Sequence, residues 1–198
     1  MPYSKFRKLK KTLDRFHLSE EGINMFPNIV EIEPSAWLIQ SLVVAKMVPL
    51  TNEKGKSERI ISPILGEIAV AYIEKITLFS GEDLTIEGED ELSGECDFFF
   101  ANRPHRNVIV APIITLVEAK NEDFEHGQAQ CVAQMYAAMR YNELADKPLP
   151  FIYGCASTGG EWKFLRLENN RVFVDSETYY LTQLPKILGI FHQIVASF

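Results

Sequence analysis

Glu118 and Lys120 are the two residues whose types and spacing most clearly suggest chemistry. They follow a mostly apolar run, 108–117, which predicts a buried central strand because both of its alternating faces are apolar. Residues two apart on a strand point to the same face, so the carboxylate and the ammonium should lie together. Charges at the end of a buried strand cost free energy unless they pair or bind a metal ion. Two explanations stay open: a structural ion pair, or a site where the carboxylate binds a hard cation and the lysine handles water or phosphate.

The elements expected around these residues alternate between helices and strands. Apolar positions at helical spacing predict five helices, the third with Ser62 as N-cap and Pro63 as first helical residue: 3–18, 35–47, 62–75, 124–143 and 182–197. Apolar runs between turn residues predict six strands: 77–87, 95–101, 108–120, 151–157, 162–167 and 171–174. This order predicts a single domain, 1–198, of the α/β class with α+β character.

A hairpin between the second and third of these strands would bring a second carboxylate to the pair. Its turn is the polar stretch 102–107, and a pairing centred near residues 107–108 would put Asp97 opposite Glu118. The polar turn is centred slightly earlier, so this register requires an offset or a bulge. Pro112 is a candidate position for it, because a proline cannot donate to the ladder.

The distribution of charge limits the classes of partner. The chain has 198 residues and a formal net charge of -7, which argues against a general nucleic-acid coat protein. Residues 1–15 nevertheless carry six basic side chains and one acidic one, a net of +5, whereas residues 82–95 are acidic with no basic residue. Both runs are ordinary for solvated surface. The basic N-terminal arm could still contact a phosphate backbone.

Other features predict a protein of the cytoplasm. The three cysteines, Cys96, Cys131 and Cys155, have no zinc-site or disulfide spacing and are expected to be reduced core residues. No apolar stretch without a charge is long enough to span a membrane, and no export signal follows the N-terminal basic residues. A cytoplasmic location without membrane association is therefore expected.

Asp97, the Glu118-x-Lys120 pair and the following helix with Gln130 together resemble the PD-(D/E)XK nuclease superfamily, as a stand-alone member. The resemblance covers about residues 62–157. Cys96 stands where the motif has its proline, which many members lack. Glu67 falls where members often place a helical glutamate. The run 127–131 resembles the start of the glutamine-bearing helix, with Gln130 the better-aligned glutamine and Gln134 in second place.

This resemblance implies a restriction-endonuclease-like fold, in which a mixed central sheet is flanked by helices. Residues 62–157 would form the nuclease-like core, 1–50 a helical N-terminal decoration, and 158–198 the C-terminal strands and helix. The implied activity is metal-dependent hydrolysis of DNA phosphodiester bonds. Mg²⁺, for which Mn²⁺ can substitute, would be bound by Asp97, Glu118, the backbone carbonyl of Ala119, and Glu67. Lys120 would orient or help deprotonate the attacking water, and Gln130 would position water or phosphate.

Two other interpretations stay open. The chain could be a catalytically silent or accessory member of the same fold that binds DNA or a protein partner. It could also be an unrelated α+β domain in which Lys120 forms a structural ion pair with Glu118 or Asp97. DNA is the expected partner and a homodimer would suit the fold, but nothing in the sequence distinguishes DNA from RNA or single from double strands.

Overall fold

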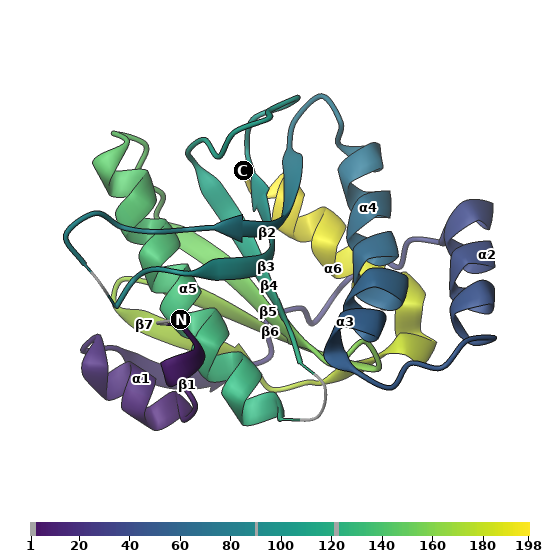
Figure 1. Ribbon diagram of the computed structural model, residues 1–198, viewed down its shortest axis with the longest axis horizontal. Coiled ribbons are helices and arrows are strands. Elements are labelled where there is room, and N and C mark those ends of the chain that lie inside the picture. The colour runs from purple at the N-terminus through teal and green to yellow at the C-terminus, as the bar shows by residue number, and fades with distance from the viewer. Residues whose placement is uncertain (1–2, 90, 121–122) are drawn as a thin grey trace.

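A mixed sheet of eight strands organises the molecule. The computed structural model describes residues 3–89, 91–120 and 123–198, and Figure 1 shows the arrangement. The strand order is β1-β7-β6-β5-β4-β3-β2, with the short β8 paired to β6. The strands are β1 (Ser19–Ile23), β2 (Thr77–Asp83), β3 (Glu95–Ala101), β4 (Ile113–Ala119), β5 (Phe151–Ser157), β6 (Glu161–Glu168), β7 (Arg171–Asp175) and β8 (Tyr179–Tyr180). Two pairings, β1 with β7 and β4 with β5, are parallel, and the others are antiparallel. The predicted α/β class is confirmed at this level.

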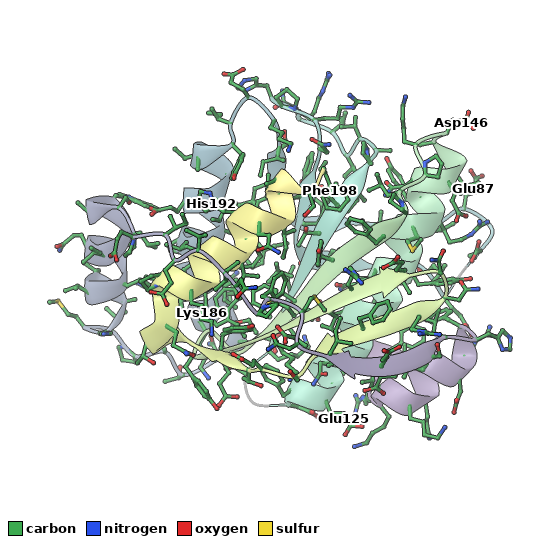
Figure 2. The ribbon with its side chains drawn as sticks, turned by 180° about the vertical axis from the view of Figure 1, so that it is seen from behind. Glu87, Glu125, Asp146, Lys186, His192 and Phe198 are labelled. Carbon is green, nitrogen blue, oxygen red and sulfur yellow. The ribbon has the colours of Figure 1, made fainter. Side chains whose placement is uncertain are left out.

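Helices cover both faces of the sheet. The long α5 (Phe124–Leu144) and α1 (Leu9–Arg15) pack on one face, and α6 (Leu184–Ala196) and α4 (Ser62–Ala71) on the other (Figures 1 and 2). The outermost helix, α2 (Ala36–Ala45), lies against α4. Shorter helical segments are η1 (Tyr3–Lys5), α3 (Glu53–Lys56), η2 (Ser57–Ile61) and η3 (Leu181–Gln183). Buried apolar side chains therefore fill two cores, one on each side of β3–β6.

Several predicted elements have the predicted bounds. The strands at 95–101 and 151–157 match β3 and β5, and the helix at 124–143 matches α5 to within one residue. No helix in the described parts of the chain combines the length and apolar character needed to cross a bilayer.

The N-terminal region differs from the helical decoration that was predicted. Residues 19–23 form β1, an edge strand that pairs with β7 in parallel, so this region contributes to the sheet itself. Most of its side chains are exposed, and its sequence Ser-Glu-Glu-Gly-Ile carries no apolar alternation. The predicted helix 3–18 is likewise two pieces, η1 and α1, separated by residues 6–8.

The hairpin of β3 and β4 has the predicted register. Phe98 pairs with Val117 and Phe100 with Thr115, and the register then shifts so that Ala101 pairs with Ile113. This irregularity falls at Ile114, two residues from Pro112, the candidate position for it. Continued by one pair beyond Phe98, the register places Asp97 opposite Glu118. The predicted strand 108–120 is shorter, since β4 begins at Ile113.

The helix predicted to begin at Ser62 in fact begins nine residues earlier. The side chain of Asn52 accepts a hydrogen bond from Gly55 N and so caps α3, and α3, η2 and α4 then continue without a break from Glu53 to Ala71. Ser62 has helical backbone angles and caps nothing. The π-helical η2 ends at Ile61, two residues before Pro63, which has no N–H to donate within the helix. Residues 53–61, which lie between two of the predicted helices, are therefore helical.

Candidate functional site

Glu118, near the end of β4, has both carboxylate oxygens engaged. Its side chain is 3% exposed. Oε1 lies 2.7 Å from Lys120 Nζ, and Oε2 accepts a hydrogen bond of 2.7 Å from Gln134 Nε2. Burial raises the pKa of Glu118 to about 8, and the nearby Asp97 carboxylate adds to the rise, while Lys120 opposes it. Glu118 is thus a buried acid whose charge depends on its partners.

Asp97 reaches the same strand end from β3. Its Oδ2 accepts a hydrogen bond of 2.8 Å from the backbone N–H of Ala119, the residue that follows Glu118. Burial raises the pKa of Asp97, and the Ala119 N–H and the Lys120 ammonium act in the opposite direction. Asp97 and Ala119 line a cleft of about 300 Å³, together with Glu53 and Glu95. Asp97 therefore meets Glu118 at the strand end, as the sequence predicted.

Lys120 lies immediately beyond β4 and is held by its backbone as well as its side chain. Its N–H donates to the carbonyl of Ser157 at 2.8 Å, which extends the β4–β5 pairing by one residue. Its stem runs against Gly127 in the first turn of α5, where an added Cβ would be 3.0 Å from Lys120 Cγ. Burial lowers the pKa of Lys120, but the carboxylates of Glu118, Asp97 and Glu53 together outweigh this, so the pKa is raised overall. The ammonium is also 3.4 Å from Glu53 Oε1.

A polar stripe on α5 faces this cluster. His126, Gln130 and Gln134 follow each other at intervals of four residues, which places them on one face of the helix. Gln130 and Gln134 are 7% and 1% exposed. Among the described residues, no hydrogen-bond partner is found for Gln130 Oε1, Gln134 Oε1 or His126 Nε2. Gln134, predicted as the second choice, is the glutamine that contacts Glu118, whereas Gln130 lies one turn nearer the start of the helix.

Glu67, which was predicted as a ligand, is not brought to the strand-end cluster. Its two carboxylate oxygens accept hydrogen bonds from the backbone N–H and the hydroxyl of Ser35, at the start of α2. Ser35 Oγ in turn caps α2 by accepting from Leu38 N. Glu67 therefore joins α4 to α2, and it lines a different pocket from Asp97.

Glu53 is the acidic residue that the sequence analysis missed. It is the first residue of α3, and it contacts Lys120 and lines the cleft beside Asp97. Two signals for an earlier helix start were present in the sequence. Asn52 is a good N-cap, and Lys54 and Glu58 have the spacing of a helical ion pair, with 3.8 Å between their charged atoms.

The oxygen atoms of this cluster are of the chemical type that binds a magnesium ion. In the described parts of the chain, no group of three or more His, Cys, Asp or Glu side chains forms a ready cation site. Mg²⁺ is usually bound by only one or two carboxylates, with waters and phosphate oxygens completing its shell. Asp97 and Glu118 meet that requirement, and the unpartnered oxygens of Gln130 and Gln134 could accept hydrogen bonds from bound water. Lys120 now lies on Glu118 Oε1, so this oxygen becomes a ligand only when the ammonium turns away.

Neither a protein-family model nor a curated protein sequence matches this chain.

Proposed function

We propose that this protein is a PD-(D/E)XK-type nuclease with a restriction-endonuclease-like fold, which hydrolyses phosphodiester bonds of DNA in a Mg²⁺-dependent reaction. One observation carries the proposal. Asp97, Glu118, Lys120 and Gln134, from three separate segments of the chain, meet at one end of β3 and β4. The cost of burying Glu118 there is difficult to explain by stability alone, because an apolar residue would fill a strand end more cheaply.

Each residue has a role that follows from its surroundings. Asp97 and Glu118 would hold Mg²⁺, and Mn²⁺ could replace it; the metal would polarise the phosphate and lower the pKa of bound water. Lys120 would hold the attacking water and offset the charge that develops on the phosphate. Glu53, 3.4 Å from Lys120 Nζ, would accept the ammonium when it leaves Glu118. Gln134 holds Glu118 in place, and Gln130 would position water from the helix side.

The state of Glu118 predicts how metal binding depends on pH. A carboxylate must lose its proton before it ligates Mg²⁺, and burial raises the pKa of Glu118 to about 8. Metal binding should therefore strengthen as the pH rises through about 8, with release of a proton.

A second candidate function has its own support. Both Glu118 oxygens are already satisfied, by Lys120 and by Gln134, which is what a structural ion pair in a catalytically silent member would require. Such a protein would bind DNA or a protein partner without cleaving it.

Cleavage assays distinguish the two functions. Supercoiled plasmid and labelled DNA oligonucleotides, single-stranded and duplex, would be incubated with Mg²⁺ or Mn²⁺ at pH 8.5, with an RNA oligonucleotide in parallel. The nuclease proposal expects metal-dependent cleavage that Asp97→Asn abolishes and Glu67→Gln retains, with circular dichroism to verify folding. Binding without cleavage by the native protein would support the silent function instead.

A further inference from the structure

Five of the eight residues that line a groove at the N-terminus are cationic. It has a volume of about 410 Å³ and lies along residues 5–15, in η1, α1 and the segment between them. Its charged lining residues are Lys5, Arg7, Lys8, Lys11, Arg15 and a single carboxylate, Glu91. All five cationic residues are exposed. Lys8 and Arg15 form ion pairs with Glu125 and Glu91, but within the described residues no ion pair neutralises Lys5, Arg7 or Lys11. The groove therefore keeps a strong positive charge in a chain whose net charge is -7.

The groove is anchored firmly to the body of the protein. Tyr3, which is buried, donates a hydrogen bond of 2.8 Å to the carbonyl of Leu84. Phe6, which lines the groove, contacts the ring of Phe16 at 5.3 Å between centroids, and Phe16 stacks on Tyr136 of α5 at 4.5 Å. The cations are thus presented at a fixed position relative to α5.

This position is next to the candidate active site. Lys8 Nζ is 2.8 Å from Glu125 in the first turn of α5, and Figure 2 shows Glu125 at the end of that helix beside α1. The adjacent His126 is influenced from both regions. Burial lowers its pKa, and so do the charges of Lys120 in the site and of Arg7 in the groove. The first turn of α5 therefore lies between the two regions.

The two regions also have opposite charge. The cleft at the strand end is lined by four acidic residues and one basic residue, Lys54, so its carboxylates attract a metal ion and repel phosphate. The acidic residues are Glu53, Glu58, Glu95 and Asp97. A nucleic-acid strand needs attraction elsewhere, and cations beside the reaction centre provide it.

We propose that the groove of Lys5, Arg7, Lys8, Lys11 and Arg15 binds the phosphate backbone of a nucleic-acid strand that continues over the start of α5 into the site. The inference rests on the proposed nuclease function for the fate of that strand, but binding in the groove is measurable without it. Binding here is expected to be independent of base sequence, because the groove offers point charges to phosphates and no paired donors and acceptors to a base edge.

The test is a binding measurement with two matched double variants. Fluorescence anisotropy would follow fluorescein-labelled 30-nucleotide DNA, single-stranded and duplex, in EDTA and at salt concentrations from 50 to 200 mM. Arg7→Glu with Lys11→Glu reverses two groove cations. Lys46→Glu with Lys147→Glu makes the same charge change at two exposed positions outside the groove. Lys147 follows α5 at its far end, roughly 30 Å from Glu125 at 1.5 Å per residue. Thermal unfolding would verify that both variants are folded.

The groove variant is expected to bind DNA at least about tenfold more weakly, with a salt dependence about 1.5 smaller in slope, while the control stays near the native protein. Equal affinities for the two variants, or no binding by the native protein, would overturn the inference. If the native protein cleaves DNA but the groove variant binds it as tightly as the native protein does, the groove is not the binding site, and the nuclease proposal is unaffected. Loss of binding in the groove variant, in a native protein that cleaves nothing, would support the groove and remove the nuclease.

Discussion

The helical segment from Glu53 to Ala71 carries a glutamate near each end, and the two have different environments. At the first end, Glu53 lies 3.4 Å from the Lys120 ammonium and shares a cleft with Asp97. Near the other end, Glu67 accepts hydrogen bonds from Ser35, the neutral N-cap residue of α2. One glutamate adds negative charge to a cluster that already holds buried charges, whereas the other fastens two helices together.

The partners of each carboxylate, and not its position in a motif, therefore decide its role. The Lys120 side chain beside Glu53 is 12% exposed, and it bridges to Glu118, which is 3% exposed. Electrostatic interactions are strong where water is excluded, so a change at this end should be felt across the whole cluster. The Glu67 end should respond only locally.

Removing the cation at the Glu53 end should have the largest effect. Lys120→Met leaves Glu118 buried without a charged partner, so the free energy of unfolding should fall by about 3–5 kcal/mol at pH 9, and by less at pH 6 where Glu118 is protonated. Cleavage should fall by about 10²- to 10³-fold. Urea unfolding at both pH values measures the first effect. A loss of stability as small as that of Glu67→Gln would erase the contrast between the two ends.

The pH dependence of stability should come from the buried end. Burial raises the pKa of Glu118 from 4.5 to about 8, so the native state holds a proton that the unfolded chain has lost over this range. The stability that the protonated carboxyl contributes is fully present below about pH 4.5 and is lost as the pH rises through about 8. Thermal unfolding from pH 4.5 to 9 without metal should show this decline. Glu118→Gln, which cannot titrate, should flatten it, whereas a decline unchanged in that variant would assign it to other groups.

Replacing each of the two glutamates separately with glutamine should show which of them affects catalysis. Glu53→Gln should raise the Mg²⁺ concentration for half-maximal cleavage by about tenfold, because second-layer partners typically tune metal sites by that order. Glu67→Gln should leave it unchanged. If Glu67→Gln has the larger effect, the predicted ligand role of Glu67 would be restored.

The smallest effect belongs to the contact between α4 and α2. Ser35→Ala removes the cap of α2 and one of the Glu67 hydrogen bonds, so it should lower the free energy of unfolding by about 1 kcal/mol. Cleavage should be unaltered. Chemical unfolding and the plasmid assay measure the two quantities, and reduced cleavage in a stable variant would contradict a purely structural role.

The sequence predicted the strand-end cluster well because one local rule controls it. Hairpin register follows from side-chain alternation, and the pairing centre near residues 107–108 placed Asp97 opposite Glu118 once a bulge near Pro112 was allowed. The sequence did not predict β1, because no such local rule applies to it. Ser19–Ile23 is held by backbone pairing at a sheet edge, so its side chains carry no pattern.

Glu67 was predicted as the helical glutamate of the site in place of Glu53, because the start of the helix was predicted too late in the chain. Ser62-Pro63 has the residue types of a helix start, yet η2 continues directly into α4, which contains Pro63, and the true cap is Asn52. Whether Gln130 or Gln134 reaches Glu118 depends on where α5 crosses β4. The periodicity of one helix does not determine this crossing point. The contact between Glu53 and Lys120 likewise joins residues far apart in the sequence, so it depends on the tertiary fold and not on a local pattern.

Calorimetric titration with Mn²⁺ at pH 8.5 measures whether Asp97 and Glu118 bind one metal ion between them, as the proposed function requires. The native protein should bind a single Mn²⁺ ion with release of a proton, Asp97→Asn should lose this binding, and Glu67→Gln should retain it. The account would be contradicted if the native protein binds no Mn²⁺, or if folded Asp97→Asn binds it as tightly as the native protein does.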